Sequence, residues 1–161
     1  MTTKEGPAIP SRKLFKLTIG GGMVFWATSI ATSLLPIAAE YRAAYSDWSI
    51  QTVWVASLPM GMIIGYGVSW FLLRYSDTIP SKNPMLKSGI LSSIALLIAV
   101  ILIDVPQSFF GMSTSSAALY YFLIGVLFNA ARFLLLGIVI GYMYTKRTHS
   151  LIKGDKNQFN Q

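Results

Sequence analysis

Four long blocks of apolar residues, separated by short polar segments, dominate the pattern along the chain. A helix that crosses about 30 Å of hydrocarbon needs about 20 residues at 1.5 Å per residue, and each block has about this length. Apolar residues fill the blocks, whereas a helix or strand of a soluble protein carries them on one face. The pattern therefore predicts an all-α membrane protein, a bundle of four transmembrane helices. The helices are expected at Leu17–Ala39, Val53–Tyr75, Met85–Val105 and Leu119–Tyr144.

The composition supports a membrane protein and limits its chemistry. Hydrophobic residues make up 53% of the chain and charged residues only 12%, against about 25% charged residues in a soluble domain. The chain has no cysteine, and its one histidine, His149, cannot form the imidazole pair that a haem or a catalytic zinc would need. No nucleophile, base and orienting group converge at one depth. We therefore expect no catalytic residue, no metal, no cofactor and no enzymatic activity.

Lysine and arginine are unevenly distributed between the two ends of the predicted bundle. The loops at one end carry only Arg42, and Arg132 lies inside the fourth helix. Cytoplasmic loops of membrane proteins are enriched in these residues, so both termini and the second connecting loop are expected to be cytoplasmic, in an inner or plasma membrane. The other 11 basic residues lie on that side: Lys4, Arg12, Lys13, Lys16, Arg74, Lys82, Lys87, Lys146, Arg147, Lys153 and Lys156.

The same pattern divides the chain into three parts. Residues 1–16 form a polar cytoplasmic segment, residues 17–144 form the four-helix transmembrane domain, and residues 145–161 form a basic cytoplasmic tail. The first apolar block is too long for the core of a signal peptide, so we expect it to remain as a transmembrane helix. The basic residues flank apolar blocks and form no basic domain. This arrangement favours contact with the anionic lipids of the bilayer over binding of nucleic acid.

Arg132 is the residue most indicative of function, because it lies near the middle of the fourth predicted helix. A guanidinium at the centre of a bilayer costs at least about 2.5 kcal/mol, so Arg132 should face protein or water. Gly125, Asn129 and Arg132 lie on one face of that helix, at positions i, i+4 and i+7. No carboxylate is expected at this depth, since the nearest ones lie near the outer ends of the helices: Glu40, Asp47 and Asp104.

Three roles are open for Arg132: it packs by hydrogen bonds to neighbouring helices, binds an anionic ligand, or pairs with a carboxylate of a partner chain. The first helix offers acceptors in Thr28, Ser29 and Thr32. Pro36 removes a backbone donor, so a bend is expected there that leaves the Thr32 carbonyl free toward a polar cavity. Alternatively, the hydroxyl groups bond to carbonyls of their own helix.

Small residues recur every four positions on two of the predicted helices. Such stripes allow helix backbones to approach closely, and they indicate packing. The pattern leaves open whether the stripes meet within one chain or between chains. They consist of Ser57, Gly61, Gly65 and Ser69 on the second helix and of Gly137 and Gly141 on the fourth.

Aromatic residues gather near the predicted ends of the helices. Tyr41, Tyr45, Trp48 and Trp54 lie toward the outer end. Tyrosine and tryptophan are enriched at the headgroup layer of membranes, so we interpret these side chains as an interfacial belt with no ligand-binding role.

Several positions resemble the N-terminal four helices of the major facilitator superfamily of transporters. In that family the first helix ends near a Leu-Pro-x-Ile-like element, a tryptophan opens the second, a motif of glycine, aspartate and basic residues follows it, and the fourth carries an inward arginine and a glycine. Here Leu73 and Thr78 replace the glycine and an arginine of the loop motif. The resemblance implies transport, although the family places its substrate site between two six-helix halves. The positions that carry it are Leu35, Pro36, Ile37, Trp54, Arg74, Asp77, Lys82, Lys87, Arg132 and Gly137.

These observations predict a small membrane protein with a transport-related role for a small polar or anionic solute. Four helices leave little room for an internal aqueous path, so we expect a homo-oligomer or a partner membrane subunit. The alternative is a non-catalytic accessory or assembly subunit of a larger membrane complex, which would use its stripes of small residues to bind partner helices.

Overall fold

The computed structural model describes residues 10–45, 48–76, 78–81, 83–106 and 115–158, with the backbone alone at residues 45, 115–117 and 147–158. All regular structure in this part is helical, and four helices are long and apolar enough to cross a membrane. The prediction of an all-α chain with four such helices is confirmed. In chain order the elements are α1 (Ser11–Ser33), α2 (Pro36–Tyr45), α3 (Ile50–Tyr75), α4 (Pro84–Ala99), the π-helical η1 (Val100–Asp104) and α6 (Ser115–Gln158).

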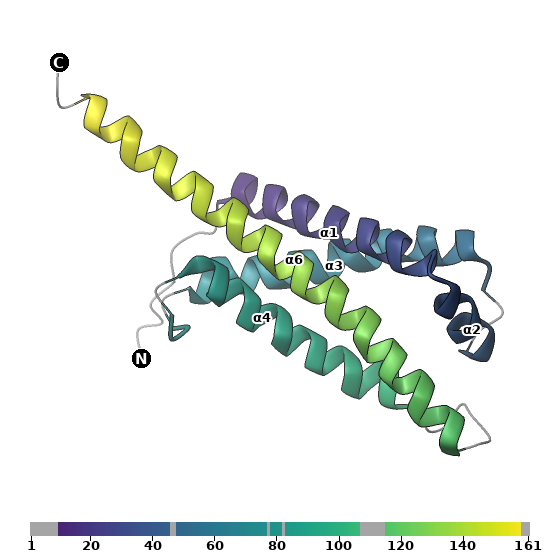
Figure 1. The fold of residues 1–161 in the computed structure, drawn as a ribbon. Coiled ribbons are helices and arrows are strands. Elements are labelled where there is room, and N and C mark those ends of the chain that lie inside the picture. Colours follow the sequence, from purple (N-terminus) through teal and green to yellow (C-terminus); the bar gives the residue numbers. More distant parts are fainter. Residues whose placement is uncertain (1–9, 46–47, 77, 82, 107–114, 159–161) are drawn as a thin grey trace, which may run out of the picture.

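The long helices alternate in direction along the bundle. Helix α1 packs mainly against α3, α4 packs against α6, and α1 also contacts α6. The short helix α2 lies at the end where α1 finishes and α3 begins, and α6 crosses the bundle at a slant (Figure 1). The C-terminal part of α6 extends beyond the other helices (Figure 1). The sequence predicted that this helix would end at Tyr144, before a basic tail, but α6 continues to Gln158.

Pro36 begins a helix and does not bend one. Helix α1 ends at Ser33, and Pro36 is the first residue of α2. Proline is well suited to this position, because the first N–H groups of a helix have no intrahelical acceptor. The Leu35 N–H donates to the Thr32 carbonyl at 3.2 Å. The prediction of a single helix over residues 17–39, with the Thr32 carbonyl left without a donor, is therefore wrong.

The stripe of small residues on α3 faces α1 of the same chain. A Cβ atom at position 61 would lie 2.9 Å from the Gly22 carbonyl oxygen, and one at position 65 would lie 3.0 Å from the Thr18 carbonyl oxygen. Ser69, one turn further along, is fully buried. Glycine at 61 and 65 thus allows backbone to contact backbone, and the dispersion gained depends on this close approach.

The second pair of small residues faces α4. A Cβ atom at Gly137 would lie 2.9 Å from the Ser92 Cβ, and one at Gly141 would lie 2.7 Å from the Met85 Cα. The Ser88 hydroxyl donates to the Gly137 carbonyl at 2.5 Å, which joins the two helices by a hydrogen bond. Both stripes therefore pair helices within one chain.

The apolar core lies between the helices, and large apolar side chains also cover the outside. Leu72, Leu136 and Ile140 have no exposed surface, whereas Ile63 is 69% and Leu127 68% exposed. In water such an outer surface would promote aggregation, but in a bilayer it is the lipid-facing surface. The described core therefore has the arrangement of a membrane bundle.

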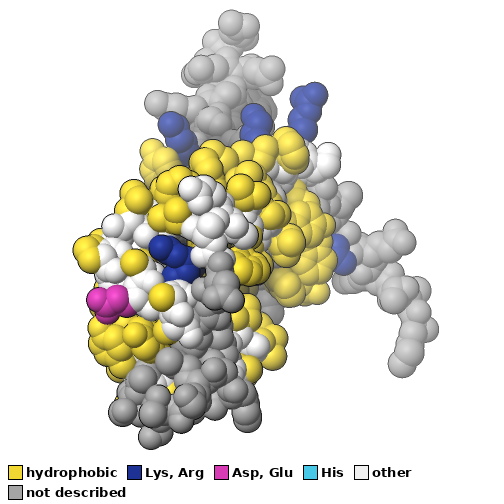
Figure 2. All heavy atoms as spheres, turned by 90° about the vertical axis from the view of Figure 1, so that its right-hand side faces the viewer, with side chains coloured by type: hydrophobic (Ala, Val, Ile, Leu, Met, Phe, Trp, Pro, Cys, Tyr) yellow, Lys and Arg dark blue, Asp and Glu magenta, His cyan; other side chains and the backbone are white. Residues whose placement is uncertain are grey.

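Apart from Arg132, the charged side chains of the described residues lie toward the two ends of the bundle. Glu40, Arg42 and Asp104 lie on α2 and at the end of η1. Figure 2 views the bundle from the end where α2 lies, and most of the lysine and arginine side chains visible there are away from the centre of that face. The opposite end carries the basic residues at the start of α1 and α4 and toward the end of α3 and α6: Arg12, Lys13, Lys16, Arg74, Lys87 and Lys146.

Candidate binding site

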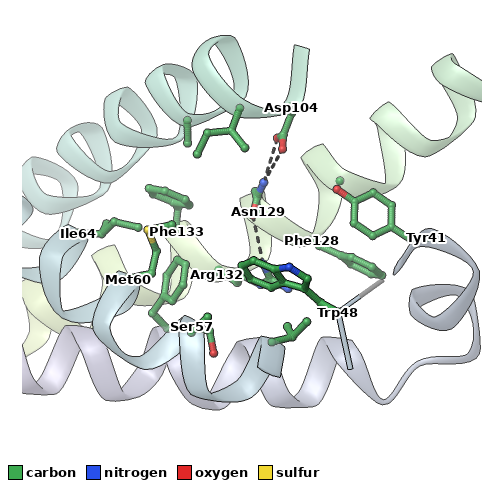
Figure 3. Close-up of a pocket in the computed structure, with 16 residues that line it drawn as sticks. Tyr41, Trp48, Ser57, Met60, Ile64, Asp104, Phe128, Asn129, Arg132 and Phe133 are labelled. Carbon is green, nitrogen blue, oxygen red and sulfur yellow. Dashed lines mark hydrogen bonds between the residues drawn. The ribbon is translucent and has the colours of Figure 1, made fainter. Parts of the chain in front are cut away.

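A line of polar side chains crosses the bundle near α2. The Asn129 Nδ2 atom donates to both carboxylate oxygens of Asp104, at 3.1 and 2.9 Å. The Asn129 Oδ1 atom accepts from an Arg132 Nη at 3.4 Å, and the other Nη donates to the Thr32 hydroxyl at 3.2 Å. Figure 3 shows Asp104, Asn129 and Arg132 in sequence along this line. Side chains from α1, η1 and α6 thus form one connected network.

Helix geometry explains why these side chains meet. Arg132 lies at the middle of the part of α6 that is long and apolar enough to cross a membrane, Ala118–Lys146. Side chains of an α-helix lean toward its N-terminus, so the long arginine side chain extends toward Asn129, one turn earlier. Asn129 and Arg132 are three residues apart and lie on the same face. The guanidinium therefore reaches the level of Thr32, near the end of α1.

The sequence predicted no carboxylate at the depth of Arg132, and the structure connects one to Arg132 through Asn129. Asp104 is only 4% exposed and belongs to the same network. Asp104 is the last residue of η1, which continues α4 as a π-helical turn. A π turn takes more residues than an α turn, so it changes the face on which the following residues lie. Such turns occur frequently at functional sites.

The network borders a cavity of about 250 Å³. Its polar lining includes Asp104, Asn129, Arg132 and Ser57, and much of the remaining wall is aromatic. Figure 3 shows Tyr41, Trp48 and Phe128 on one side of Arg132 and Met60, Ile64 and Phe133 on the other. A cavity of this kind, mostly apolar with a few convergent polar groups, is typical of a small-molecule site.

Tyr41 and Trp48 were interpreted from sequence as parts of an interfacial belt, but both line the cavity. The Tyr41 and Phe128 rings are in edge-to-face contact, with centroids 5.9 Å apart. A Cβ atom at Gly125 would lie 2.8 Å from the Tyr41 hydroxyl oxygen, so glycine at this position provides space for the ring. Tyr41 and Trp48 both follow α1, in a region that the sequence assigned to an outer helix end. An aromatic residue in that region is expected at the headgroup level, so the sequence did not indicate that these two rings line a cavity.

The predicted hydroxyl groups of α1 divide into two kinds. The Thr28 hydroxyl donates to the Val24 carbonyl at 2.7 Å, and the Ser29 hydroxyl donates to the Phe25 carbonyl at 2.9 Å. These bonds lie within α1, as the alternative interpretation expected. Thr32 donates to the Thr28 carbonyl at 2.9 Å and also accepts from Arg132. Of these three residues, Thr32 is the one that belongs to the network.

Two tryptophans fix α1 against α3 close to this network. The Trp54 indole N–H donates to the Ser33 hydroxyl at 2.7 Å, and the Trp26 indole N–H donates to the Trp54 carbonyl at 2.9 Å. Ser33 directly follows Thr32 in α1. The indole bonds therefore hold the acceptor of Arg132 at a fixed distance from α3.

The network leaves hydrogen-bonding capacity at both of its charged groups. The Arg132 Nε atom is buried and has no hydrogen-bond partner, although a guanidinium has five N–H donors. Both Asp104 oxygens accept from one amide nitrogen, so the carboxylate, with about four lone-pair sites, retains acceptor capacity. Among the described residues, no group of three histidine, aspartate or glutamate side chains could hold a metal ion.

Comparison of the chain with protein-family models, with curated proteins and with solved structures finds no match. The resemblance to major facilitator transporters therefore gains no support from these comparisons. The basis for any assignment is therefore the set of four helices that could cross a membrane and the cavity next to Arg132, which has a few polar groups in a mostly apolar wall.

Proposed function

We propose that this protein binds a small polar solute with an anionic group in the cavity beside Arg132, in a transport-related role. The observation that carries the proposal is the Arg132 guanidinium, which lines the cavity and has five N–H donors, of which the structure pairs one with Asn129 and one with Thr32. An unpaired donor on a charged group inside a membrane is costly, and such groups commonly mark substrate or ion pathways. A carboxylate or phosphate would accept hydrogen bonds from the planar guanidinium.

The charges around the cavity favour a solute with more than one polar group. Arg132 and Asp104 lie at the two ends of the line through Asn129 and both border the cavity. An anionic group at Arg132 would leave room for a hydrogen-bond donor of the same solute at Asp104. Rings of Tyr41, Trp48 and Phe128 would exclude water from the bound solute, and the weaker screening would strengthen these polar contacts.

We further propose that the cavity opens on the extracytoplasmic side of an inner or plasma membrane. Most of the described basic residues lie at the end of the bundle opposite α2, as the predominance of lysine and arginine in cytoplasmic loops would require. Tyr41 lies on α2, Asp104 ends η1, and both line the cavity. A solute would then enter from outside.

The alternative, an accessory subunit that binds partner helices by its small-residue stripes, has less support. Gly61 and Gly65 contact α1, and Gly137 and Gly141 contact α4, so these stripes are occupied within the chain. A partner subunit or a second copy would have to bind another surface. Binding of a solute is therefore the function that the site supports best.

Thermal unfolding in nanodiscs with small anions tests the proposal. Phosphate or acetate at 100 times its Kd should stabilise the wild-type protein by about 2.7 kcal/mol. Arg132→Lys keeps the charge but loses the planar fork, so binding should weaken at least about ten-fold while folding is retained. Arg132→Leu should fold and bind no anion, because the cationic group is removed.

Arg42→Leu is the matched control, since Arg42 lies at the same end but does not line the cavity. This variant should bind anions as the wild type does. Anion stabilisation of equal size in Arg132→Leu would show that the anions act elsewhere. If none of the anions stabilises the wild-type protein, the proposed function is wrong.

A further inference from the structure

A second, larger cavity lies between α3 and α4. Its volume is about 530 Å³, and every residue of its wall is apolar or glycine. Phe71 is 48%, Ile94 50% and Leu102 68% exposed, so this groove lies on the lipid-facing side of the bundle. The remaining wall is formed by Met60, Ile64, Gly67, Val68, Leu91, Ala95, Ile98, Ala99, Ile103 and Phe133.

The apolar groove adjoins the cavity beside Arg132. Both are bordered by Met60, Ile64, Ala99, Ile103 and Phe133. Ile103 and Asp104 are consecutive residues of η1, so the chain passes there from the wall of the groove to the polar network. Figure 3 shows Met60, Ile64 and Phe133 beside Arg132, on the side away from Tyr41 and Trp48. A bound molecule that extends past these three side chains would enter the groove.

We infer that the solute of this site is an amphiphile, with an anionic head at Arg132 and one hydrocarbon chain in the groove between α3 and α4. This inference rests on the proposed function and specifies its substrate class. A polar head needs the donors of Arg132, which the groove does not supply. A hydrocarbon chain needs an apolar wall that continues to the bilayer core, and the groove supplies it. The juxtaposition of the two cavities fits a molecule with both parts.

The length and position of the groove fit a hydrocarbon chain. From Leu91 to Ile103 the groove follows α4 for a rise of about 18 Å at 1.5 Å per residue. The groove shares Met60, Ile64 and Phe133 with the cavity beside Arg132, so a chain that lies in it can be continuous with a head group at Arg132. A partner helix could cover the groove from outside, but it has no charged head group to place at Arg132.

Two glycines of the bundle allow a specific test of the groove. At Gly67, which lines the groove, and at Gly89, which does not, an added Cβ atom would meet nothing within 4 Å. Large side chains should therefore be tolerated at both positions. Gly67→Trp fills the groove, and Gly89→Trp is the matched control on a surface outside it.

The experiment compares dodecyl phosphate, dodecyltrimethylammonium and methyl phosphate in phosphatidylcholine nanodiscs. Native mass spectrometry measures the amphiphiles retained per protein at equal mole fraction in the bilayer, so partition into lipid affects both alike. Binding of methyl phosphate is measured by the thermal stabilisation of the protein that it causes. Wild type should retain dodecyl phosphate at least ten-fold better than the cationic amphiphile. Gly67→Trp should lose most of this preference and keep its response to methyl phosphate, whereas Gly89→Trp should keep both.

The outcomes separate this inference from the proposed function. If methyl phosphate stabilises the protein but wild type retains the two amphiphiles equally, the amphiphile is excluded and a water-soluble anion remains the solute. If neither phosphate compound binds, the proposed function fails as well. A co-purified protein subunit that is lost from Gly67→Trp would assign the groove to a partner and overturn the inference. If Gly67→Trp does not fold, the relative retention of dodecyl phosphate and dodecyltrimethylammonium by the wild-type protein is sufficient to test the inference.

Discussion

Replacing Asn129 by leucine should lower the free energy of unfolding by about 3 kcal/mol, because it leaves a buried carboxylate without its donor. The Asn129 amide supplies the hydrogen bonds to both oxygens of Asp104, and the Asp104 side chain is only 4% exposed. The substitution also removes the acceptor of one Arg132 Nη. The measurement is chemical or thermal unfolding in nanodiscs of fixed lipid composition.

A double variant provides the control for this prediction. Asp104→Leu together with Asn129→Leu removes both partners, and replacing both by apolar groups can be nearly neutral. The double variant should therefore recover at least half of the stability lost in Asn129→Leu. If the stability lost in Asp104→Leu and in Asn129→Leu simply adds in the double variant, the two residues are not coupled. That result would contradict the role of the hydrogen-bond network in stabilising this end of the bundle.

Gly65→Leu should destabilise the bundle by about 3 kcal/mol, at the upper end of the usual cost of overpacking. A Cβ atom at this position would lie 3.0 Å from the Thr18 carbonyl oxygen and 3.1 Å from the Gly22 nitrogen. These neighbours are backbone atoms of α1 and cannot rotate away, so the two helices must separate. The midpoint of unfolding in lipid measures the effect.

Gly67→Leu is the matched control two residues away on the same helix. A Cβ atom at Gly67 meets nothing within 4 Å, so the same substitution should leave stability almost unchanged. Equal stability of the Gly65 and Gly67 variants would mean that α1 does not contact α3 through this face.

The four helices could be predicted from sequence because their signal is local. Each span is a continuous apolar block, and a bilayer of fixed thickness requires about 20 such residues. The face shared by Asn129 and Arg132 also followed from helical periodicity within one element, and the structure joins these two residues to Thr32 by hydrogen bonds. Helix ends were less predictable, since the break before Pro36 depends on whether proline bends a helix or begins one.

The link between Asp104 and Arg132 could not be predicted, because it depends on relations between helices. Counting residues along a straight helix puts Asp104 at an outer end, where it does lie, but does not show that Asn129 connects it to Arg132. In the structure, a π turn alters its face, α6 crosses the bundle at a slant, and the arginine side chain extends toward it. Tyr41 and Trp48 were missed for a related reason. An aromatic ring at headgroup level has the same sequence pattern whether it faces lipid or a cavity.

A single cysteine in the cavity tests the central claim that a water-accessible, anion-binding site lies beside Arg132 on the extracytoplasmic side. The natural chain has no cysteine, so Ser57→Cys introduces a unique thiol at a residue that lines the cavity. Ser93→Cys, on an exposed position of α4 outside the cavity, is the control. Thiolate forms in water and hardly at all in lipid. The measurement is labelling by a membrane-impermeant thiosulfonate in vesicles of known orientation, with and without phosphate.

We expect the reagent to label Ser57→Cys from the extracytoplasmic side, phosphate to slow this labelling, and Ser93→Cys to remain unlabelled. The phosphate effect should disappear when Arg132→Leu is added to Ser57→Cys, because the guanidinium is then absent. Labelling of Ser57→Cys from the cytoplasmic side alone would contradict the orientation. Absence of labelling from both sides, or labelling that phosphate does not slow, would contradict the binding site.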